Sequence, residues 1–480
     1  MRSVVCDRVN PMKRAFSVIA LSILSTLSFA SVAMPAVFSD NMVLQRDLKV
    51  KVWGWAAPSE EIQVLIDDQK WLTNADKNGD WSVTLSPHKA GGPYRMTIQG
   101  ANHIEFKNVM YGDVWVCSGQ SNMEFQVPRS INGQDEVKDA DHPNIRLYLV
   151  PLTSSESPLA TIGSGWSVCS PQTVTGFSAV GYFFGRELAS RTGVTIGLIS
   201  TSWGGTPVES WTSREALRRV PETSRMLDEH LALMADPARM ASATPQQKNK
   251  SWYPGALYNG MIAPFTNFAI RGAIWYQGES NTGNPLLYNK TFPNMIRDWR
   301  KAWGIGDFPF YFVQLANFVG NPGWPGLREA QFCTLDLPNT GMAVTIDIGN
   351  HSDIHPKNKQ EVGRRLALWA QRDVYHEKNL VVSGPLYSGM ETKGSKIVLS
   401  FDYANGLKSK DGGPLVGFEI AGADGNYVEA NAVIDGNKVV VSSPSVTVPI
   451  SVRYAWAPDP KQNLTNAAGL PASPFTTEEN

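Results

Sequence analysis

Cysteine is scarce in this chain of 480 residues, which contains 4 Cys. The positions are Cys6, Cys117, Cys169 and Cys333. A disulfide framework of the kind that holds small secreted domains together is therefore excluded, and at most one bridge could form once Cys6 is removed. No cysteines or histidines are spaced as metal ligands either, so we expect neither a metal nor any other cofactor.

Net charge and long apolar runs are also lacking. Lys and Arg number 43 against 44 Asp and Glu, which gives a formal net charge of -1. This balance provides no general field to attract nucleic acid or an anionic membrane. After residue 33 no apolar run reaches the about 20 residues that a membrane span needs. We expect no nucleic-acid partner and no membrane span in the mature chain.

The first 33 residues have the pattern of a cleavable secretory signal peptide. A basic group at residues 12–14 precedes an apolar run at 15–29, and small residues follow up to Ala33. We expect cleavage after Ala33, with Ala30 as the competing site, and Met12 is a second candidate for the start. The mature protein is then secreted or periplasmic, in a bacterial host.

The remaining chain is longer than the roughly 250–300 residues at which a single core stops growing, so several domains are expected. Residues 34–108 alternate in short runs separated by turn residues, which predicts a β module. Apolar strand-like runs alternate with helix-like segments across 109–380, and this pattern predicts an α/β domain with a parallel sheet flanked by helices. Short strands return at 385–476 and predict a second β module.

The stretch from Val114 to Phe125 is the first candidate for a catalytic site. Val114 to Cys117 resembles a buried strand, and Gly119 permits a sharp turn just before Ser121. Strand ends of α/β sheets are where sites collect. A serine nucleophile also requires a histidine base, a group that orients the base, and donors for an oxyanion.

Two later strand ends offer such donors. Gly204 and Gly205 follow one apolar run, and paired glycines let backbone N–H groups approach a ligand. Asn281 follows another, where its amide can donate to developing negative charge. A tight turn at the glycines and a local Asn turn are the alternative interpretations. Glu279, in the same loop as Asn281, either bonds within the loop or takes part in the site.

The candidate base is His355, one of 7 His in the chain. It precedes a predicted helix, and Asp353 shares its side of an extended backbone because residues two apart face the same way. The carboxylate can therefore orient the imidazole and stabilise its cation. His351 is the reserve candidate for the base.

Together these stretches resemble the SGNH hydrolases, and more closely the sialate O-acetylesterase-like carbohydrate esterases. The blocks that carry the resemblance are Gly119-Gln-Ser-Asn-Met123, Trp203-Gly-Gly-Thr-Pro207, Trp275-Tyr-Gln-Gly-Glu-Ser-Asn281 and Asp353-Ile-His-Pro356. An opening strand around residues 37–46 and a closing segment at 466–475 extend the likeness over nearly the whole mature chain. The implied fold is a flavodoxin-like parallel sheet with β-sandwich-like modules at both ends.

The resemblance also assigns roles. It makes Ser121 the nucleophile and His355 the base, and it implies an oxyanion hole from the Ser121 N–H, Gly204 or Gly205, and Asn281. Asp353 is then the orienting carboxylate. The wider class spaces these residues as Asp-x-x-His, so Asp347, Glu279 or a backbone carbonyl remain alternatives for that role.

The implied substrate is an O-acetylated carbohydrate, either sialic acid or a plant polysaccharide such as xylan or xyloglucan. Sugar contacts are expected from Gln120, Trp203, Trp211, Trp275 and Glu279. A sialate carboxylate would need a cation, for which the candidates are Arg129, Arg214, Arg271 and Arg328; structural ion pairs are the alternative for all four. A secreted glycan-binding protein without catalysis and a secreted peptidase are the competing functions. The oligomeric state does not follow from the sequence.

Overall fold

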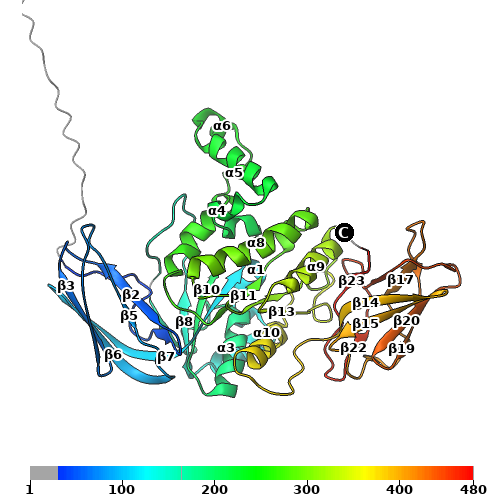
Figure 1. Ribbon diagram of the computed structural model, residues 1–480, viewed down its shortest axis with the longest axis horizontal. Helices are drawn as coiled ribbons and strands as arrows, with labels where there is room; N and C mark the ends of the chain where they lie inside the picture. The colour runs from blue at the N-terminus through cyan, green and yellow to red at the C-terminus, as the bar shows by residue number, and fades with distance from the viewer. Residues whose placement is uncertain (1–30, 164, 479–480) are drawn as a thin grey trace, which may run out of the picture.

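The computed structural model describes residues 31–163 and 165–478, so most of the expected signal peptide lies outside the described residues. An α/β domain occupies the centre, with one β module at each side of it (Figure 1). Within the described residues, no helix is long and apolar enough to cross a membrane. The expected α/β domain with a mostly parallel sheet flanked by helices is confirmed, as are the additional C-terminal sheets.

The central sheet has the strand order β13-β12-β11-β7-β10-β8-β9, in which only β9 runs antiparallel to its neighbour. These strands are β7 (His103–Gly119), β8 (His142–Leu149), β9 (Ser167–Cys169), β10 (Ile196–Ser202), β11 (Gly272–Tyr276), β12 (Phe310–Val313) and β13 (Thr340–Ala343). Residues of β10, β11 and β12 are buried throughout, as expected for strands covered on both faces.

This strand order contains the flavodoxin-type order 2-1-3-4-5. In chain order β7, β10, β11, β12 and β13 are strands 1 to 5, and they lie side by side as β10-β7-β11-β12-β13. The antiparallel pair β8 and β9 is added outside β10. The burial pattern agrees with this addition, because β10 is entirely buried whereas β8 has exposed residues near both ends and suits an outer position.

Helices cover both faces of this sheet. The helix α3 packs with α10 on one side, and α8 packs with α9 on the other (Figure 1). Their bounds are α3 (Ala179–Thr192), α8 (Pro285–Trp303), α9 (Trp324–Cys333) and α10 (Lys359–Asp373). Ser178 and Asn358 cap the N-termini of α3 and α10 through their side chains, so both starts have the polar caps that orphan N–H groups require.

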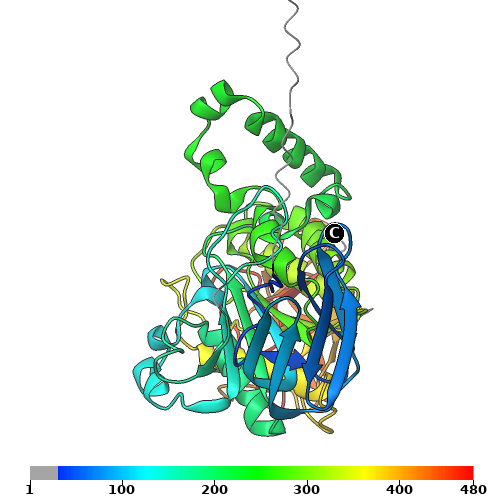
Figure 2. The same cartoon turned by 90° about the vertical axis from the view of Figure 1, so that its left-hand side faces the viewer.

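Six further α-helices complete the described part of the central domain. They are α1 (Ser121–Glu124), α2 (Gly133–Lys138), α4 (Arg214–Leu217), α5 (Pro221–Met234), α6 (Pro237–Ser242) and α7 (Pro245–Lys248). The segment with α5 and α6 projects away from the sheet as a helical arm (Figure 2). The helix α1 is the one that begins at the candidate nucleophile.

The N-terminal β module is continuous with the central sheet through β7. Its other strands are β1 (Val43–Gln45), β2 (Val50–Trp55), β3 (Glu61–Ile66), β4 (Gln69–Asn74), β5 (Asp80–Leu85) and β6 (Gly91–Gln99). β6 pairs antiparallel with the first half of β7, while β10 and β11 pair with its second half. The boundary expected at residue 108 therefore falls inside a strand, and one hydrophobic core runs through both parts.

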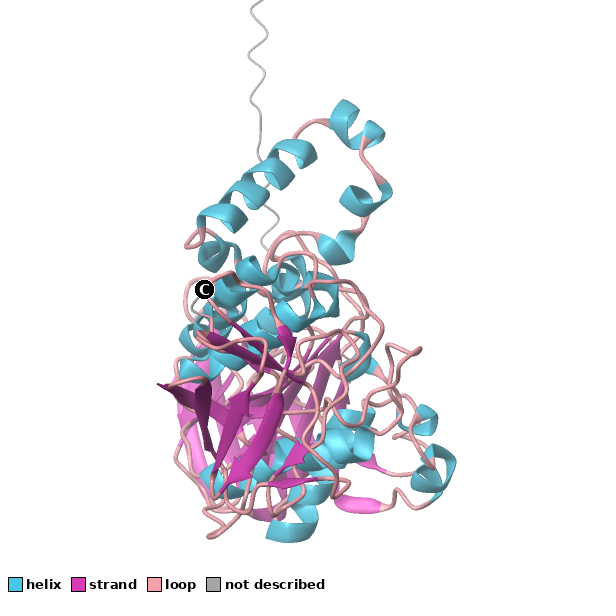
Figure 3. Ribbon diagram, turned by 90° about the vertical axis from the view of Figure 1, so that its right-hand side faces the viewer, coloured by secondary structure: helices cyan, strands magenta, loops and turns pink. Residues whose placement is uncertain are grey.

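The C-terminal β module has a core of its own. Its strands form the sheets β14-β15-β20-β19 and β18-β17-β21-β23, with β16 paired to β22. This module faces the viewer in Figure 3. The bounds are β14 (Leu386–Lys393), β15 (Lys396–Asp402), β16 (Lys408–Ser409), β17 (Phe418–Ala421), β18 (Val428–Glu429), β19 (Asn431–Asp435), β20 (Lys438–Ser442), β21 (Ser451–Tyr454), β22 (Leu464–Thr465) and β23 (Phe475–Thr476). Buried Arg328 of α9 ties this module to the central domain by donating to the carbonyls of Ala457 and Pro458, each at 2.8 Å.

A buried carboxylate joins the N-terminal module to the end of the sheet remote from Ser121. Asp113 is fully buried and accepts hydrogen bonds from Gln45, Arg46, Arg271 and the Tyr375 hydroxyl at 2.8 to 3.0 Å. Burial by itself would raise the pKa of Asp113, but the charges and hydrogen bonds of Arg271 and Arg46 hold it below its usual value. The carboxylate is therefore ionised and paired.

Replacing Asp113 by Asn should destabilise the protein by about 3–5 kcal/mol, because two partly buried guanidiniums would lose their counter-charge. The measurement is urea or thermal unfolding beside Asp135→Asn, which removes an exposed, solvent-screened pair with Lys138 and should leave stability nearly unchanged. Equal effects of the two substitutions would contradict this account.

Candidate functional site

The position of Ser121 is set by a close approach between β7 and β11. Gly119 ends β7 with φ +141°, and a Cβ at this position would lie 2.1 Å from the Tyr276 carbonyl oxygen. Only glycine fits such a backbone approach. The next N–H, that of Gln120, donates to the same carbonyl at 3.0 Å, and Ser121 then begins α1.

His355 lies beside the serine hydroxyl. Its Nε2 is 2.9 Å from Ser121 Oγ, although the two residues are 234 positions apart in the chain. Burial, assisted by the positive charges of Lys359 and Arg129, lowers the pKa of His355, while Asp353 opposes this shift. A neutral imidazole that contacts a serine hydroxyl can accept its proton.

Asp353 is near the imidazole without being hydrogen-bonded to it. Its Oδ1 is 3.8 Å from His355 Nδ1, and the same oxygen accepts the His355 backbone N–H at 2.9 Å. The other carboxylates considered for orienting the imidazole have different partners, since Asp347 pairs with Arg365 and Glu279 bonds Asn122. Asp353 is also 48% exposed, so its charge is screened by solvent.

The reserve base, His351, is directed elsewhere. Its Nδ1 is 2.5 Å from Asp459 Oδ2 in the C-terminal module, and its side chain is 70% exposed. The structure therefore brings only His355, of these two histidines, to Ser121.

Asn281 has a fixed amide orientation. Its Oδ1 accepts hydrogen bonds from the Val208 N–H at 3.0 Å and from Gln277 Nε2 at 2.7 Å. Its Nδ2 donates to the Glu209 carboxylate, at 3.0 Å for the shorter contact. Glu209 is 3% exposed, and burial raises its pKa. The buried Glu209 carboxylate therefore holds the Asn281 side-chain amide in one orientation.

The paired glycines differ in their hydrogen bonding. Gly204 lies against the nucleophile, since a Cβ on it would be 3.3 Å from Ser121 Cβ, and its N–H donates to Glu124 Oε2 at 2.6 Å. The Gly205 N–H makes no hydrogen bond within the described residues. Gly205 has φ +72° and no atom within 4 Å of a Cβ built on it, so its surroundings are open.

Asn122 connects the nucleophile to the histidine segment. Its Nδ2 donates to the Ile354 carbonyl at 3.0 Å and to Glu279 Oε1 at 2.6 Å, while its Oδ1 accepts from Lys359 Nζ. Burial lowers the pKa of Lys359 to about 7 and raises that of Glu279. The residue after Ser121 is thus bonded to the residue before His355, and this fixes the spacing of the two.

Several residues expected to contact sugar have other places in the fold. Arg271 pairs with Asp113 at the start of β11, at the opposite end of the sheet from Ser121, and is corrected to a structural role. Trp211 and Trp275 are fully buried and pack edge to face at 6.0 Å, so they belong to the core. Gln120 is 3% exposed, and its Oε1 accepts the Ser280 N–H at 3.3 Å.

The other residues expected to contact a sugar differ in how accessible they are. Trp203 is partly exposed beside Gly204 and stays available to a ligand. Arg328 is buried on carbonyl groups, and Arg214 bonds the carboxylate and the carbonyl of Glu156. Arg129 lies over the Phe125 ring at 4.5 Å and is exposed.

Glu209 and Lys359 were missed by the sequence analysis. Glu209 lies between Val208 and Ser210, two residues after the block that contains the paired glycines. Lys359 stands three positions before Val362 on the buried face of α10. A charged residue on an apolar helix face is the signal that could have identified it.

Comparisons with known proteins agree with this arrangement. The profile of the family "carbohydrate esterase, sialic acid-specific acetylesterase" matches residues 111–371. Sialate O-acetylesterases of Rattus norvegicus and Homo sapiens are 32% and 31% identical, covering 92% and 91% of this chain and 93% and 91% of their own. The crystal structure of a carbohydrate acetylesterase from Xanthomonas citri has a TM-score of 0.85 and 40% identity, over 94% of this chain and 100% of that one. The chain therefore belongs to the carbohydrate esterase family of sialic acid-specific acetylesterases and is a carboxylic ester hydrolase.

Proposed function

We propose that the protein is a secreted O-acetylesterase that removes acetyl groups from sugars through a Ser121 acyl-enzyme. The observation that carries the proposal is the 2.9 Å contact between His355 Nε2 and Ser121 Oγ. Candidate substrates are O-acetylated sialic acid, as the names of the curated relatives suggest, and acetylated xylan or xyloglucan oligosaccharides. The central domain is assigned to the SGNH hydrolases on its sequence blocks.

The reaction proceeds in two steps. His355 accepts the Ser121 proton as the hydroxyl oxygen attacks the acetyl carbonyl, and it returns the proton to the departing sugar hydroxyl. A water molecule deprotonated by His355 then attacks the acyl-enzyme and releases acetate. Asp353 stabilises the imidazolium through space at 3.8 Å.

Three donors stabilise the tetrahedral oxyanion in this proposal. They are the Ser121 N–H, the Asn281 amide and one glycine N–H. Of the two glycines we assign Gly205, because the Gly204 N–H already donates to Glu124. Glu209 is a positioning residue, since it acts by holding the Asn281 amide.

Secretion follows from the basic and apolar N-terminal sequence. The contacts of Val32 and Ala33 favour signal-peptide cleavage after Ala30 over cleavage after Ala33. Val32 is 3% exposed, and Ala33 exchanges backbone hydrogen bonds with Trp55 at 2.8 and 2.9 Å. Cleavage after Ala30 retains these contacts in the N-terminal module, whereas cleavage after Ala33 would remove them.

Ser121→Ala should lower acetate release on the order of 10⁴-fold or more while leaving the thermal unfolding temperature nearly unchanged. The measurement is acetate released from O-acetylated sialic acid and from acetylated xylan and xyloglucan oligosaccharides. If the wild-type protein releases acetate from none of them, the esterase proposal fails and the glycan-binding alternative is preferred. Cleavage of peptide bonds would favour a peptidase instead.

Asp353→Asn should reduce kcat/KM by no more than about tenfold, because a screened ion pair contributes about 0.2–1 kcal/mol. Asn can still accept the His355 backbone N–H, so the local backbone is preserved. Loss of the negative charge also lowers the pKa of His355 further, and the acid limb of the pH profile moves to lower pH. A loss near 10⁴-fold would instead mean that Asp353 hydrogen-bonds the imidazole during catalysis. Exposed Asp139→Asn is the control.

Lys359→Met should move the acid limb of kcat/KM to higher pH. The Lys359 charge lowers the pKa of His355, so its removal raises that pKa and leaves less neutral base at acid pH. The control is Lys357→Met, which removes an exposed lysine from the same segment. An acid limb at the same pH in wild type and Lys359→Met would refute the electrostatic coupling.

A further inference from the structure

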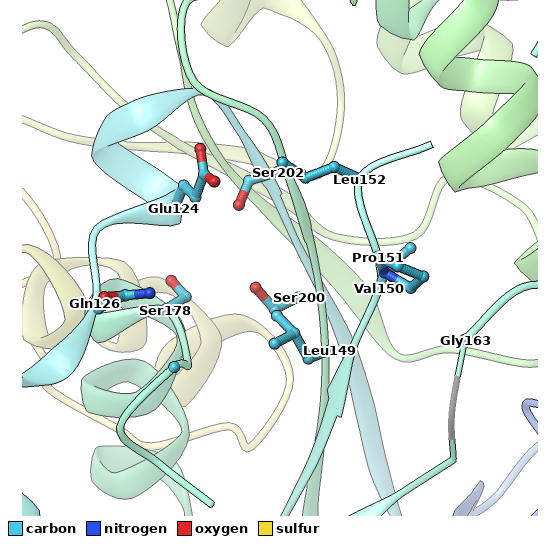
Figure 4. A pocket seen from close by; sticks show the side chains of 11 residues that line it. Glu124, Gln126, Leu149, Val150, Pro151, Leu152, Gly163, Ser178, Ser200 and Ser202 are labelled. Atoms are coloured by element: carbon cyan, nitrogen blue, oxygen red, sulfur yellow. The ribbon is translucent and has the colours of Figure 1, made fainter. Parts of the chain in front are cut away.

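A cavity of about 440 Å³ lies between α1 and the ends of β8 and β10 (Figure 4). Glu124 forms part of its wall and stands one helical turn after Ser121. The Glu124 carboxylate accepts the Gly204 N–H, and Gly204 lies against Ser121. Ser121 does not itself line the cavity, and Glu124 is the lining residue that connects the cavity to it.

Two serine hydroxyls point into the cavity without protein partners. Ser200 and Ser202 are 3% and 6% exposed, and they share one face of β10 because they are two residues apart. Neither hydroxyl is hydrogen-bonded to any described residue, whereas Thr201 on the other face donates to the Met261 carbonyl at 3.0 Å. Since both serines line the cavity, their hydroxyls are available to a ligand in it.

Apolar side chains lie beside the two serines. Leu149 ends β8 and pairs with Ser200 of β10, and Val150, Pro151 and Leu152 follow it, while Glu124, Gln126 and Ser178 lie on the other side of the cavity (Figure 4). Leu149 and Leu152 are 50% and 49% exposed, which is high for leucines that line a cavity. A sugar ring has hydroxyls at its rim and C–H groups on its faces, so a cavity lined by both polar and apolar side chains matches it.

The charge of the lining distinguishes between classes of sugar. Glu124 is the charged residue among those that line the cavity, and no lysine, arginine or histidine lines it within the described residues. A sugar carboxylate would be repelled by Glu124 and would find no cation there. The hydroxyls of a neutral sugar can instead donate hydrogen bonds to the Glu124 carboxylate, and such charge-assisted hydrogen bonds are strong.

We propose that this cavity is a binding subsite for a neutral sugar unit of the acetylated substrate. Glu124, Ser200 and Ser202 bind its hydroxyls, and Leu149 and Leu152 pack on the ring. The inference rests on the proposed esterase function and narrows its substrate to acetylated neutral oligosaccharides. It also makes the subsite select against O-acetylated sialic acid.

The test measures binding separately from catalysis. Calorimetry gives the Kd of acetylated xylo-oligosaccharides for the Ser121→Ala protein. The same Kd is then measured for a variant that also carries Ser200→Ala and Ser202→Ala. Loss of two hydrogen bonds should raise Kd by about tenfold. Ser190→Ala, an exposed serine on α3, is the matched control and should not change Kd. An unchanged Kd in the Ser200 and Ser202 variant would overturn the subsite.

Glu124→Gln tests the selectivity in the active protein. The ratio of kcat/KM for acetylated xylo-oligosaccharides to that for O-acetylated sialic acid should fall, because the repulsive charge is gone while a hydrogen-bonding side chain remains. A wild-type preference for sialic acid, or a ratio unchanged in the variant, would refute the inference. Failure of the esterase proposal gives a different result, namely no acetate from any substrate.

Discussion

The close passage of β7 and β11 is the constraint on which the site depends. Because Gly119 has no side chain, the Tyr276 carbonyl can lie against its backbone and accept the Gln120 N–H. The chain then turns directly into α1 with Ser121 at its start. Any larger residue at 119 would push apart the two strands whose ends bear the serine and Asn281. The positions of the proposed oxyanion donors depend on the same contact.

Asn122 extends this constraint to the histidine. Its amide joins three segments that are distant in sequence: the nucleophile turn, the loop with Glu279, and the stretch from Ile354 to Lys359. A small polar network of this kind helps to hold one arrangement in a buried setting. Asp353 Oδ1 lies 3.8 Å from His355 Nδ1, which is too far for a hydrogen bond. Backbone and amide contacts, such as that between Asn122 and the Ile354 carbonyl, therefore contribute more to the position of His355.

The sequence predicted the elements that have local signals. Continuous apolar runs ending at small residues predicted β7, β10 and β11, and the helix expected after His355 is α10. Periodicity did not predict the strand order, since it does not say which strand lies beside which, and nothing in the sequence indicated that β8 and β9 are added outside β10. The role expected of Arg271 failed for a related reason: its partner, Asp113, is 158 residues away in the chain. Charged side chains reveal their partners only when the tertiary contacts are known.

The strand β7 has a consequence for how the protein unfolds. One half of its 17 residues belongs to the N-terminal module and the other half to the catalytic sheet, with a shared core beneath. If the N-terminal module opened, β6 would separate from β7, which also positions Ser121. These two parts therefore form one cooperative unit, whereas the C-terminal module, with its separate core, can lose structure without breaking β7. Damage to the N-terminal module is thus transmitted to Ser121 along a single uninterrupted backbone.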